Sequence, residues 1–194
     1  NFWEDWDRPI HFYFHENETD DFSEFNAGIK IFGGWSRGQN GQRSMSIFAR
    51  GEYGDSKFDH PFFNQLGYDN FQALVLRNSG QDWMRSSMKD IILTSLMRGS
   101  GLDFQEHNPV ATYINGEYWG MYNLREKINE HMLASKHNVD ADDITLLTNN
   151  AEEIEGSNEE YNQLIDYISS TDLTLDSNFE YVEQQIDLNA YALY

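Results

Sequence analysis

The chain contains no cysteine, and this absence excludes several kinds of chemistry. Disulfide bonds, thiolate metal sites and a cysteine nucleophile are ruled out, while the redox compartment stays open because secreted proteins can also lack cysteine. No uncharged apolar stretch approaches about 18 residues, so the sequence predicts no membrane span. The first residues have neither the basic start nor the apolar core of an export signal.

Basic residues are absent from the last third of the chain. From His137 to Tyr194 there are fourteen Asp and Glu and no Lys or Arg, so this third carries −14 of the net charge of −20. A chain this acidic repels phosphate backbones and anionic lipid at long range, and we therefore predict that nucleic acid is not a partner. Carboxylates at this density are typical of a solvated surface, with cation binding as the alternative.

The motifs of several enzyme and metal-site classes are missing as well. The six histidines show no HExxH spacing and no zinc-site pattern, and neither a GxSxG nor a P-loop sequence occurs. The run DADD at 140–143 lacks the glycine and the final glutamate of a calcium loop, which favours a turn and a helix start there. We predict no metal site within the chain.

The sequence does contain ample material for a folded core. Its 194 residues are 39% hydrophobic and 15% aromatic, which suits one domain or two small ones. In the first half, segments 9–15, 27–34 and 43–50 alternate apolar and polar residues with the period of a strand. They predict an antiparallel sheet, to which 71–80 adds a shorter apolar run.

The period then changes to that of a helix. Between residues 81 and 101 apolar side chains recur at helical spacing, and Gly99 and Gly101 follow as stop signals. The apolar positions are Met84, Met88, Ile91, Ile92 and Leu96. This pattern predicts one helix of about three to four turns. Ser87 and Asp90 have the spacing of a capping box near its start.

Residues 109–124 predict a β-hairpin. Asn115-Gly116 supplies the two positive φ angles of a type I′ turn between two β-rich runs, the second of which ends at Tyr122. A charged helix is predicted directly afterwards, over 125–138, with Ile128 and Met132 on its apolar side.

The remaining chain is predicted to be mostly helical. The pairs Ser157 with Glu160 and Ser177 with Glu180 have capping-box spacing and predict two helix starts. Asp187 predicts the cap of a third helix, which is still running at the last residue.

This order of strands, helix, hairpin and connector is also that of a protein-kinase small lobe and its junction with the helical lobe. At the residue level the chain resembles the spore-coat-protein-H-like (CotH) kinase family over nearly its whole length. The segments with this resemblance are NAGIKIFGGWSRG, RSMSIFAR, LVLRNSG, INGEYWGMYNLREKINEHML and NVDADDITLL. NGEYWGMYNLREKI is the most specific, because a run of that length with fixed aromatics, glycines and charges is rarely met by chance.

The resemblance implies an α+β fold in two parts. Residues 1–125 would form a protein-kinase-like small lobe, an antiparallel sheet with one packed helix. Residues 126–194 would form the first helices of a helical lobe, acidic and truncated. The implied function is that of an atypical protein kinase, which holds ATP with Mg or Mn between two lobes and transfers the γ-phosphate to hydroxyls of a protein substrate. Family members are typically secreted or at the cell surface, so we expect the same localisation.

The resemblance also points to candidate cofactor-binding residues in the glycine-rich turn 33–44. Ser36, Arg37 and Arg43 could hold phosphate oxygens there, together with backbone amides. The family usually has a lysine near Arg43, and an arginine changes the geometry of a phosphate contact. The alternative is a hairpin loop with solvated arginines.

Three further candidates lie in the helix and at the connector. Asp90 is the candidate partner of the phosphate-binding Arg43, although a surface aspartate near a helix start also gains from the helix dipole. Glu126 and Lys127 flank the expected interlobe hinge, where backbone groups would meet the adenine edge. The alternative is that these two charges solvate the start of a helix.

Finally, the resemblance implies that some machinery is missing. In this family a catalytic loop and a metal-binding aspartate lie in motifs resembling Asn-Thr-Asp-Trp and Trp-Asp-x-Asp, after the helix that IDLNAYALY begins, and the sequence contains neither motif. We predict that the chain holds no catalytic residue, is a fragment, and lacks kinase activity alone.

Two other functions stay open: a degenerate kinase scaffold, and a secreted non-catalytic module that recognises carbohydrate or peptide. The aromatic platform of such a module would draw on eleven tyrosines and five tryptophans, which are Trp3, Trp6, Trp35, Trp83 and Trp119.

Overall fold

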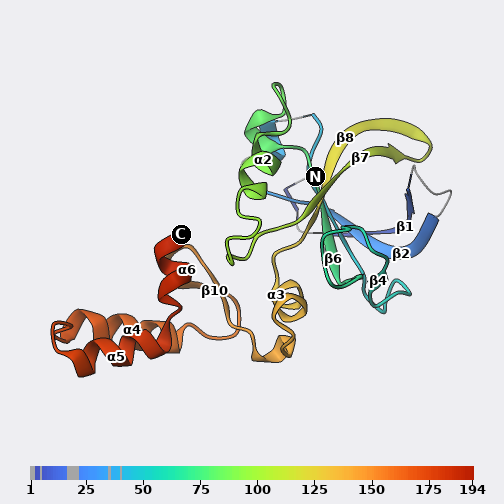
Figure 1. Cartoon of the computed structure of the whole chain (residues 1–194). Coiled ribbons are helices and arrows are strands. Elements are labelled where there is room, and N and C mark those ends of the chain that lie inside the picture. The colour runs from blue at the N-terminus through green and yellow to red at the C-terminus, as the bar shows by residue number, and fades with distance from the viewer. Residues whose placement is uncertain (1–2, 5, 17–21, 35, 40) are drawn as a thin grey trace.

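Six strands form one curled antiparallel sheet, as shown by the computed structural model, which describes residues 3–4, 6–16, 22–34, 36–39 and 41–194 (Figure 1). The spatial order is β1-β2-β3-β6-β8-β7. These strands are β1 (Arg8–His15), β2 (Phe22–Ile31), β3 (Met45–Phe48), β6 (Ala73–Arg77), β7 (His107–Ile114) and β8 (Glu117–Glu126). The predicted strands 9–15, 27–34 and 43–50 are confirmed as the neighbours β1, β2 and β3.

The remaining elements are short strands and helices. Two small ladders pair β4 (Phe58–Asp59) with β5 (Asn70–Phe71) and β9 (Leu146–Thr148) with β10 (Glu152–Glu155). The α-helices are α1 (Ser36–Gln39), α2 (Lys89–Ser95), α3 (Glu130–His137), α4 (Glu159–Ser170), α5 (Asp176–Gln185) and α6 (Leu188–Leu193). The 3-10 turns are η1 (Gly80–Asp82), η2 (Ala141–Asp143) and η3 (Asn149–Ala151). The fold is α+β, as predicted.

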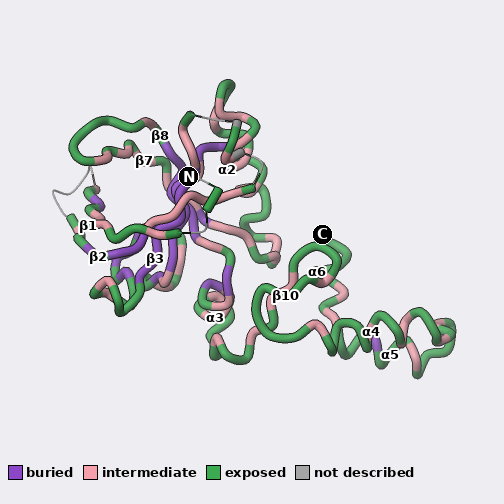
Figure 2. Tube along the Cα trace, turned by 180° about the vertical axis from the view of Figure 1, so that it is seen from behind, coloured by how far each residue is buried: buried purple, intermediate pink, exposed green. Residues whose placement is uncertain are grey.

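The core lies on one face of the sheet. Strand alternation places Ile47, Leu74 and Leu124 on this face, each 1% exposed or less. The segment between β4 and β5 packs against them with phenylalanines, of which Phe58 and Phe62 are also almost fully buried. Burying each such side chain contributes about 1.5–3 kcal/mol. Figure 2 shows that burial is concentrated in the sheet, whereas the C-terminal helices are mostly exposed.

The opposite face of the sheet is polar. The register aligns Lys30, Ser46, Val75 and Arg125 in one row across β2, β3, β6 and β8. Arg77 of β6 lies two residues further along the same face, and the helix α2 packs there through Asp90. We call this the cationic face and define it by Lys30, Arg77, Arg125 and Lys127. Lys127 directly follows β8 and lies two residues after Arg125. Side chains two residues apart along a strand point to the same face, so Lys127 is included.

The β7–β8 hairpin is confirmed, but β8 is longer than predicted. Asn115 and Gly116 have φ of 51° and 83°, and they join strands in which Ile114 lies opposite Glu117. The strand continues to Glu126, because its last residues pair with β6. The helix predicted from residue 125 therefore begins only at Glu130, where the side chain of Asn129 accepts a hydrogen bond from the Met132 amide at 3.0 Å.

The helix predicted over 81–101 is also shorter, since α2 spans only Lys89–Ser95. The capping box at Ser87 and Asp90 was wrong, because Ser87 has a φ of 54° and caps nothing. Asp82 replaces it: its Oδ2 accepts hydrogen bonds from the amides of Met88 and Lys89, both at 3.1 Å. Gly99 and Gly101 have positive φ, but they do not end the helix, which already stops at Ser95.

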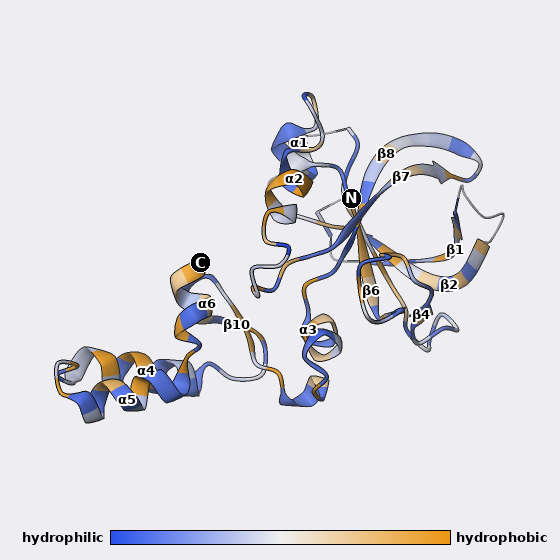
Figure 3. Cartoon of the chain, viewed as in Figure 1, coloured by the Kyte–Doolittle hydropathy of each residue, from blue (hydrophilic) through white to orange (hydrophobic). Residues whose placement is uncertain are grey.

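The apolar stripe of this segment faces outward. Ile91 is 4% exposed, but Met84 is 80% and Leu96 is 68% exposed. Figure 3 shows the apolar residues on α2 and again along α4 and α5, which extend away from the sheet. The apolar stripe predicted a longer helix than the one that forms. The helix is short because most of the stripe finds no apolar surface in the described chain to pack against.

Helices form where the sequence predicts them in the C-terminal part, but of the three predicted caps only Asp187 is confirmed, because Asn158 and not Ser157 is the N-cap of α4. Asp187 caps α6 as predicted, since its Oδ1 accepts from the amides of Asn189 and Ala190 at 2.9 and 3.0 Å. The hydroxyl of Ser157 accepts from the Glu159 amide at the start of α4, whereas Ser177 lies inside α5 and does not cap it. The short β9–β10 hairpin was not predicted. Within the described residues, none of the helices has the length and apolar character needed to cross a bilayer.

Candidate functional site

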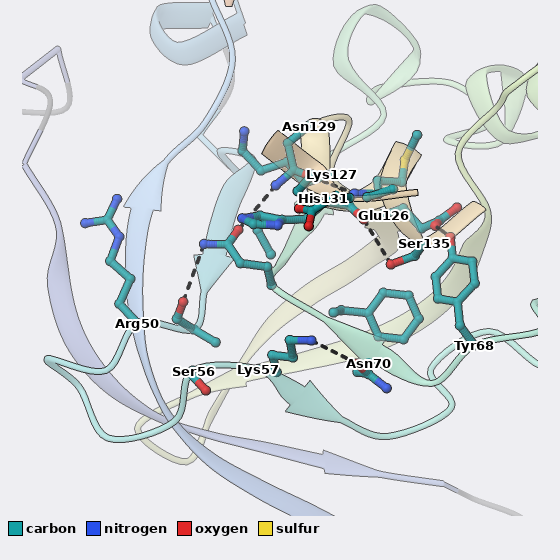
Figure 4. A pocket seen from close by; sticks show the side chains of 18 of the residues that line it. Arg50, Ser56, Lys57, Tyr68, Asn70, Glu126, Lys127, Asn129, His131 and Ser135 are labelled. Atoms are coloured by element: carbon teal, nitrogen blue, oxygen red, sulfur yellow. Dashed lines mark hydrogen bonds between the residues drawn. The ribbon is translucent and has the colours of Figure 1, made fainter. Parts of the chain in front are cut away.

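A pocket of about 600 Å³ opens where the sheet meets α3 (Figure 4). Its wall combines the ends of β3, β6 and β8 with the loop after β3 and with α3 itself. Small-molecule sites commonly have volumes of about 300–1,000 Å³. Small apolar side chains, Ala49 and Ala73, line it beside the cations Arg50, Lys57 and Lys127. Glu126 and Asp140 also line it, so the pocket has the size of a small-molecule site and a charged lining in which cations outnumber carboxylates.

Lys127 is the least neutralised of these cations. It is half-buried, and no hydrogen bond or ion pair joins its ammonium group to any residue in the described parts of the chain. Burial lowers the pKa of Lys127, and the positive charge of Lys30 lowers it further against the opposing charge of Glu130.

Glu126 faces the other way and is held by the protein. Its side chain is 1% exposed; one carboxylate oxygen accepts a hydrogen bond from the Tyr68 hydroxyl, and the other accepts from the Glu106 amide at 2.8 Å. Lys136 of α3 lies 3.4 Å from the same carboxylate. Burial, followed by the hydrogen bond to Glu126, raises the pKa of Tyr68. This network fixes α3 to the end of β8, and the contact of Glu126 with a cofactor stays a prediction.

A second cluster lies at the other end of the cationic face. The Oδ2 atom of Asp90 accepts hydrogen bonds from Arg77 Nε and from Arg125 Nη1, both at 2.6 Å. The Arg125 side chain is 5% exposed and that of Arg77 is 33% exposed. Burial alone would raise the pKa of Asp90, but the hydrogen bond from Arg77 and the charge of Arg125 outweigh it and lower that pKa. Arg77 therefore presents a fixed guanidinium group toward solvent.

The glycine-rich turn is braced by its own arginines. Arg37 Nη2 donates to the Ile31 carbonyl at 2.9 Å, and Arg43 Nε donates to the Arg37 carbonyl at 2.9 Å. The backbone of Ser36 lies in α1, but its side chain is outside the described residues. Asp90 was expected to pair with Arg43; it pairs with Arg77 and Arg125, and no ion pair joins it to Arg43 within the described parts of the chain. Phosphate contacts from this turn stay a prediction.

Sequence reasoning missed Arg77 and the residue after it. Asn78, which is 2% exposed, accepts a hydrogen bond from the Ser44 hydroxyl at 2.8 Å and donates to the Gln42 carbonyl at 2.6 Å. It therefore ties the end of β6 to the glycine-rich turn. The signal was present in LVLRNSG, where a cation directly follows an apolar strand and precedes a turn.

The two ends of the cationic face are a nucleotide length apart. Ala73, which lines the pocket, and Arg77 are four residues apart on β6, or about 13 Å at the usual rise of a strand. This span is comparable with an extended nucleotide triphosphate. A single ligand could therefore contact both the pocket and Arg77.

No metal centre accompanies these clusters in the described part of the chain, whereas exposed aromatic rings do meet on the β7–β8 hairpin, where the ring centroids of Tyr113 and Tyr118 are 5.4 Å apart. Among the residues that the structure describes, no three His, Asp or Glu side chains converge in a way that could hold a metal ion. Trp3, Trp6 and Trp119 are each about half exposed on separate segments, and Trp83 donates to Gln42 at 2.8 Å. Trp35 lies outside the described residues.

Comparison with known protein families shows what the chain is similar to. The family described as CotH kinase protein matches residues 29–194, which include the cationic face, α2, the pocket and the C-terminal helices. No curated protein matches the chain.

Proposed function

The chain belongs to the CotH kinase family, and we propose that its cationic face binds the ATP of an atypical protein kinase whose acceptors are protein hydroxyls. ATP would supply the phosphoryl group, and the residues of this chain would bind and orient it. The observation that carries the proposal is the ion pair between Arg77 on the sheet and Asp90 on α2.

This pair has the setting of the phosphate-binding cation in protein kinases. There, a cation on a sheet strand is held by an acidic residue on the helix that follows the strand. Here β6 carries Arg77, α2 follows and carries Asp90, and β8 lies between β6 and β7 in the sheet. Asp90 would fix the direction of the Arg77 guanidinium, and the buried Arg125 would hold Asp90 in place. A planar guanidinium group suits bidentate contact with phosphate.

The remaining features of the site fit the same ligand. The pocket has a suitable volume, the cationic face carries positive charge in a chain of net charge −20, and Lys127 belongs to both the pocket wall and the cationic face. Local cations matter more in such a chain, because its overall charge opposes the approach of an anion.

The metal ion is a different matter. The described residues offer no group of acidic or histidine side chains for Mg or Mn, so no step is assigned to a metal here. Phosphoryl transfer needs a held metal and a positioned acceptor. We propose that the 194 residues bind nucleotide without transferring its phosphate.

The first experiment measures ATP binding by thermal stabilisation and by calorimetry. We expect ATP to raise Tm, and Arg77→Gln to weaken ATP binding by about tenfold or more, since hydrogen bonds to charged groups contribute about 1.5–3 kcal/mol. Arg85→Gln is the matched control, because Arg85 is exposed on the same segment and loses the same charge. Equal ATP affinity in both variants, or no stabilisation of the wild type, contradicts the proposal.

A second experiment tests transfer and the competing function. Incubation of the chain with labelled ATP, Mn and a protein acceptor should leave the acceptor unlabelled, and turnover would disprove the proposed inactivity. Stabilisation by glycans together with indifference to ATP would support a recognition module instead.

A further inference from the structure

Lys127 is an exception among the less exposed cations of this chain. The side chains of Arg125 and Lys136 are 5% and 12% exposed, and each faces a carboxylate, Asp90 and Glu126 respectively. Lys127 is half-buried in the pocket wall, yet no hydrogen bond or ion pair joins its ammonium group to a residue that the structure describes, and Glu130 acts on it only through its charge. The chain has 33 carboxylates for 13 basic side chains, so a shortage of acids does not explain this.

The surroundings of Lys127 make an unpaired charge costly. Removing an ammonium group from water is unfavourable unless an opposite charge or an acceptor replaces the water. The charge of Lys30 adds repulsion from the same face. Arg50 and Lys57 line the same pocket; Arg50 is paired with Asp7 and Glu52 at 3.2 and 3.5 Å, whereas Lys57 donates to Asn70 at 3.4 Å and has no ion pair in the described part of the chain. These cations line one cavity of about 600 Å³ from separate sides, together with the carboxylates of Glu126 and Asp140. An anion in this cavity would relieve the repulsion and pair the half-buried charge of Lys127.

We infer that the pocket contains an oxyanion subsite centred on Lys127, which binds a phosphate group at the end of the cationic face opposite Arg77. The strand β6, from Ala73 to Arg77, separates the subsite from the Arg77–Asp90 pair. The inference deepens the proposed function where the phosphate is that of the nucleotide. It also holds where a second phosphate-bearing molecule occupies the pocket, because Lys127 recognises the oxyanion and not the rest of the ligand.

The test uses the 194-residue chain and inorganic tripolyphosphate, measured by calorimetry at one low ionic strength. We expect the wild type to bind tripolyphosphate, Lys127→Gln to weaken binding by about tenfold or more, and Lys127→Arg to retain most of it, because arginine keeps the charge. Lys89→Gln is the matched control: Lys89 is exposed on α2 and loses the same charge outside the pocket.

The ligand-free protein provides a second readout. Replacing a lysine that supports the fold would lower the stability of the protein. Replacing an anion-binding lysine that is repelled by the charge of Lys30 should not lower it. We therefore expect the urea midpoint of Lys127→Gln to equal or exceed that of the wild type. A lower midpoint, no tripolyphosphate binding by the wild type, or equal binding by Lys127→Gln and Lys89→Gln would overturn the inference.

ATP titrations then identify the source of the phosphate. Weaker ATP binding by Lys127→Gln assigns the subsite to the phosphates of the nucleotide. Unchanged ATP binding, with tripolyphosphate and ATP bound together, assigns it to another phosphorylated molecule. If Arg77→Gln loses ATP binding but Lys127→Gln binds tripolyphosphate as the wild type does, the proposed function stands and the subsite is disproved. If Lys127→Gln loses tripolyphosphate binding but Arg77→Gln binds ATP as the wild type does, the subsite stands and the proposed function is disproved.

Discussion

Replacing Asp90 by Asn removes the only carboxylate that the described structure places on two arginines of the cationic face. Both Arg77 Nε and Arg125 Nη1 lie 2.6 Å from its Oδ2 atom. The amide of Asn could still accept a hydrogen bond, but it carries no charge. Arg125, whose side chain is 5% exposed, would then keep a buried charge with Thr94 as its remaining side-chain acceptor, at 3.2 Å.

The expected loss of stability follows from that burial. Removing one partner of a buried ion pair costs about 3–5 kcal/mol, because the other charge stays buried and uncompensated. The Asp90 and Arg77 side chains are 31% and 33% exposed, and solvent screening reduces the effect. We expect Asp90→Asn to lower the free energy of unfolding by about 2–3 kcal/mol at pH 7.

The pH dependence has a definite sign. The pKa of Asp90 is lowered in the folded protein, so its ionised form stabilises the fold above the unfolded pKa of about 3.9. This contribution disappears as the pH falls through the lower, folded pKa. The difference in stability between wild type and Asp90→Asn should therefore be large at pH 7 and should shrink in acid below about pH 4.

Urea unfolding followed by circular dichroism measures both effects. Asp142→Asn is the control, because Asp142 is exposed and its replacement removes the same charge. Adding Arg125→Met to Asp90→Asn should restore part of the stability, since the buried charge is then gone. A difference from wild type below about 0.5 kcal/mol at pH 7, or one that persists unchanged in acid, would refute this account of the cluster.

Two further predictions concern the supports of the site. Asp82→Ala removes the carboxylate that accepts from the Met88 and Lys89 amides, and it should destabilise the protein by about 1 kcal/mol, with faster hydrogen exchange at the start of α2. Tyr68→Phe leaves the buried carboxylate of Glu126 without one donor and should cost about 1–3 kcal/mol in urea unfolding, whereas Tyr13→Phe, at an exposed residue, should cost almost nothing.

Local patterns predicted most of the sheet. The alternation in 9–15 and 43–50 predicted two strands that form, although both faces of the second one are buried, and Asn115-Gly116 placed the hairpin turn. The cap at Asp187 was equally local, because a side chain and two nearby amides are enough to form it. These features depend on residues that are close in sequence, where spacing alone carries the information.

Non-local contacts account for the errors and omissions. β8 continues to Glu126 because it pairs with β6, and no local signal shows that pairing. The apolar stripe of 84–96 predicted a long helix, but helical length depends on a packing surface that the stripe lacks here. Arg77 was missed because its role depends on residues that are distant in the sequence. Its partner Asp90 lies thirteen residues later and Arg125 a further thirty-five, and the fold brings all three together on one face.

The site also depends on a turn that is remote from it. Side chains alternate along β8, so Leu124 enters the core while Arg125 reaches α2. A slip of one residue would put the guanidinium group among phenylalanines and Leu124 against Asp90. The two-residue turn at Asn115-Gly116 sets the register at Ile114 and Glu117, and the irregularity after Thr112 adjusts it for the rest of the ladder. The sequence of the hairpin thus determines which side chains can form the cationic face, although the turn itself touches none of them.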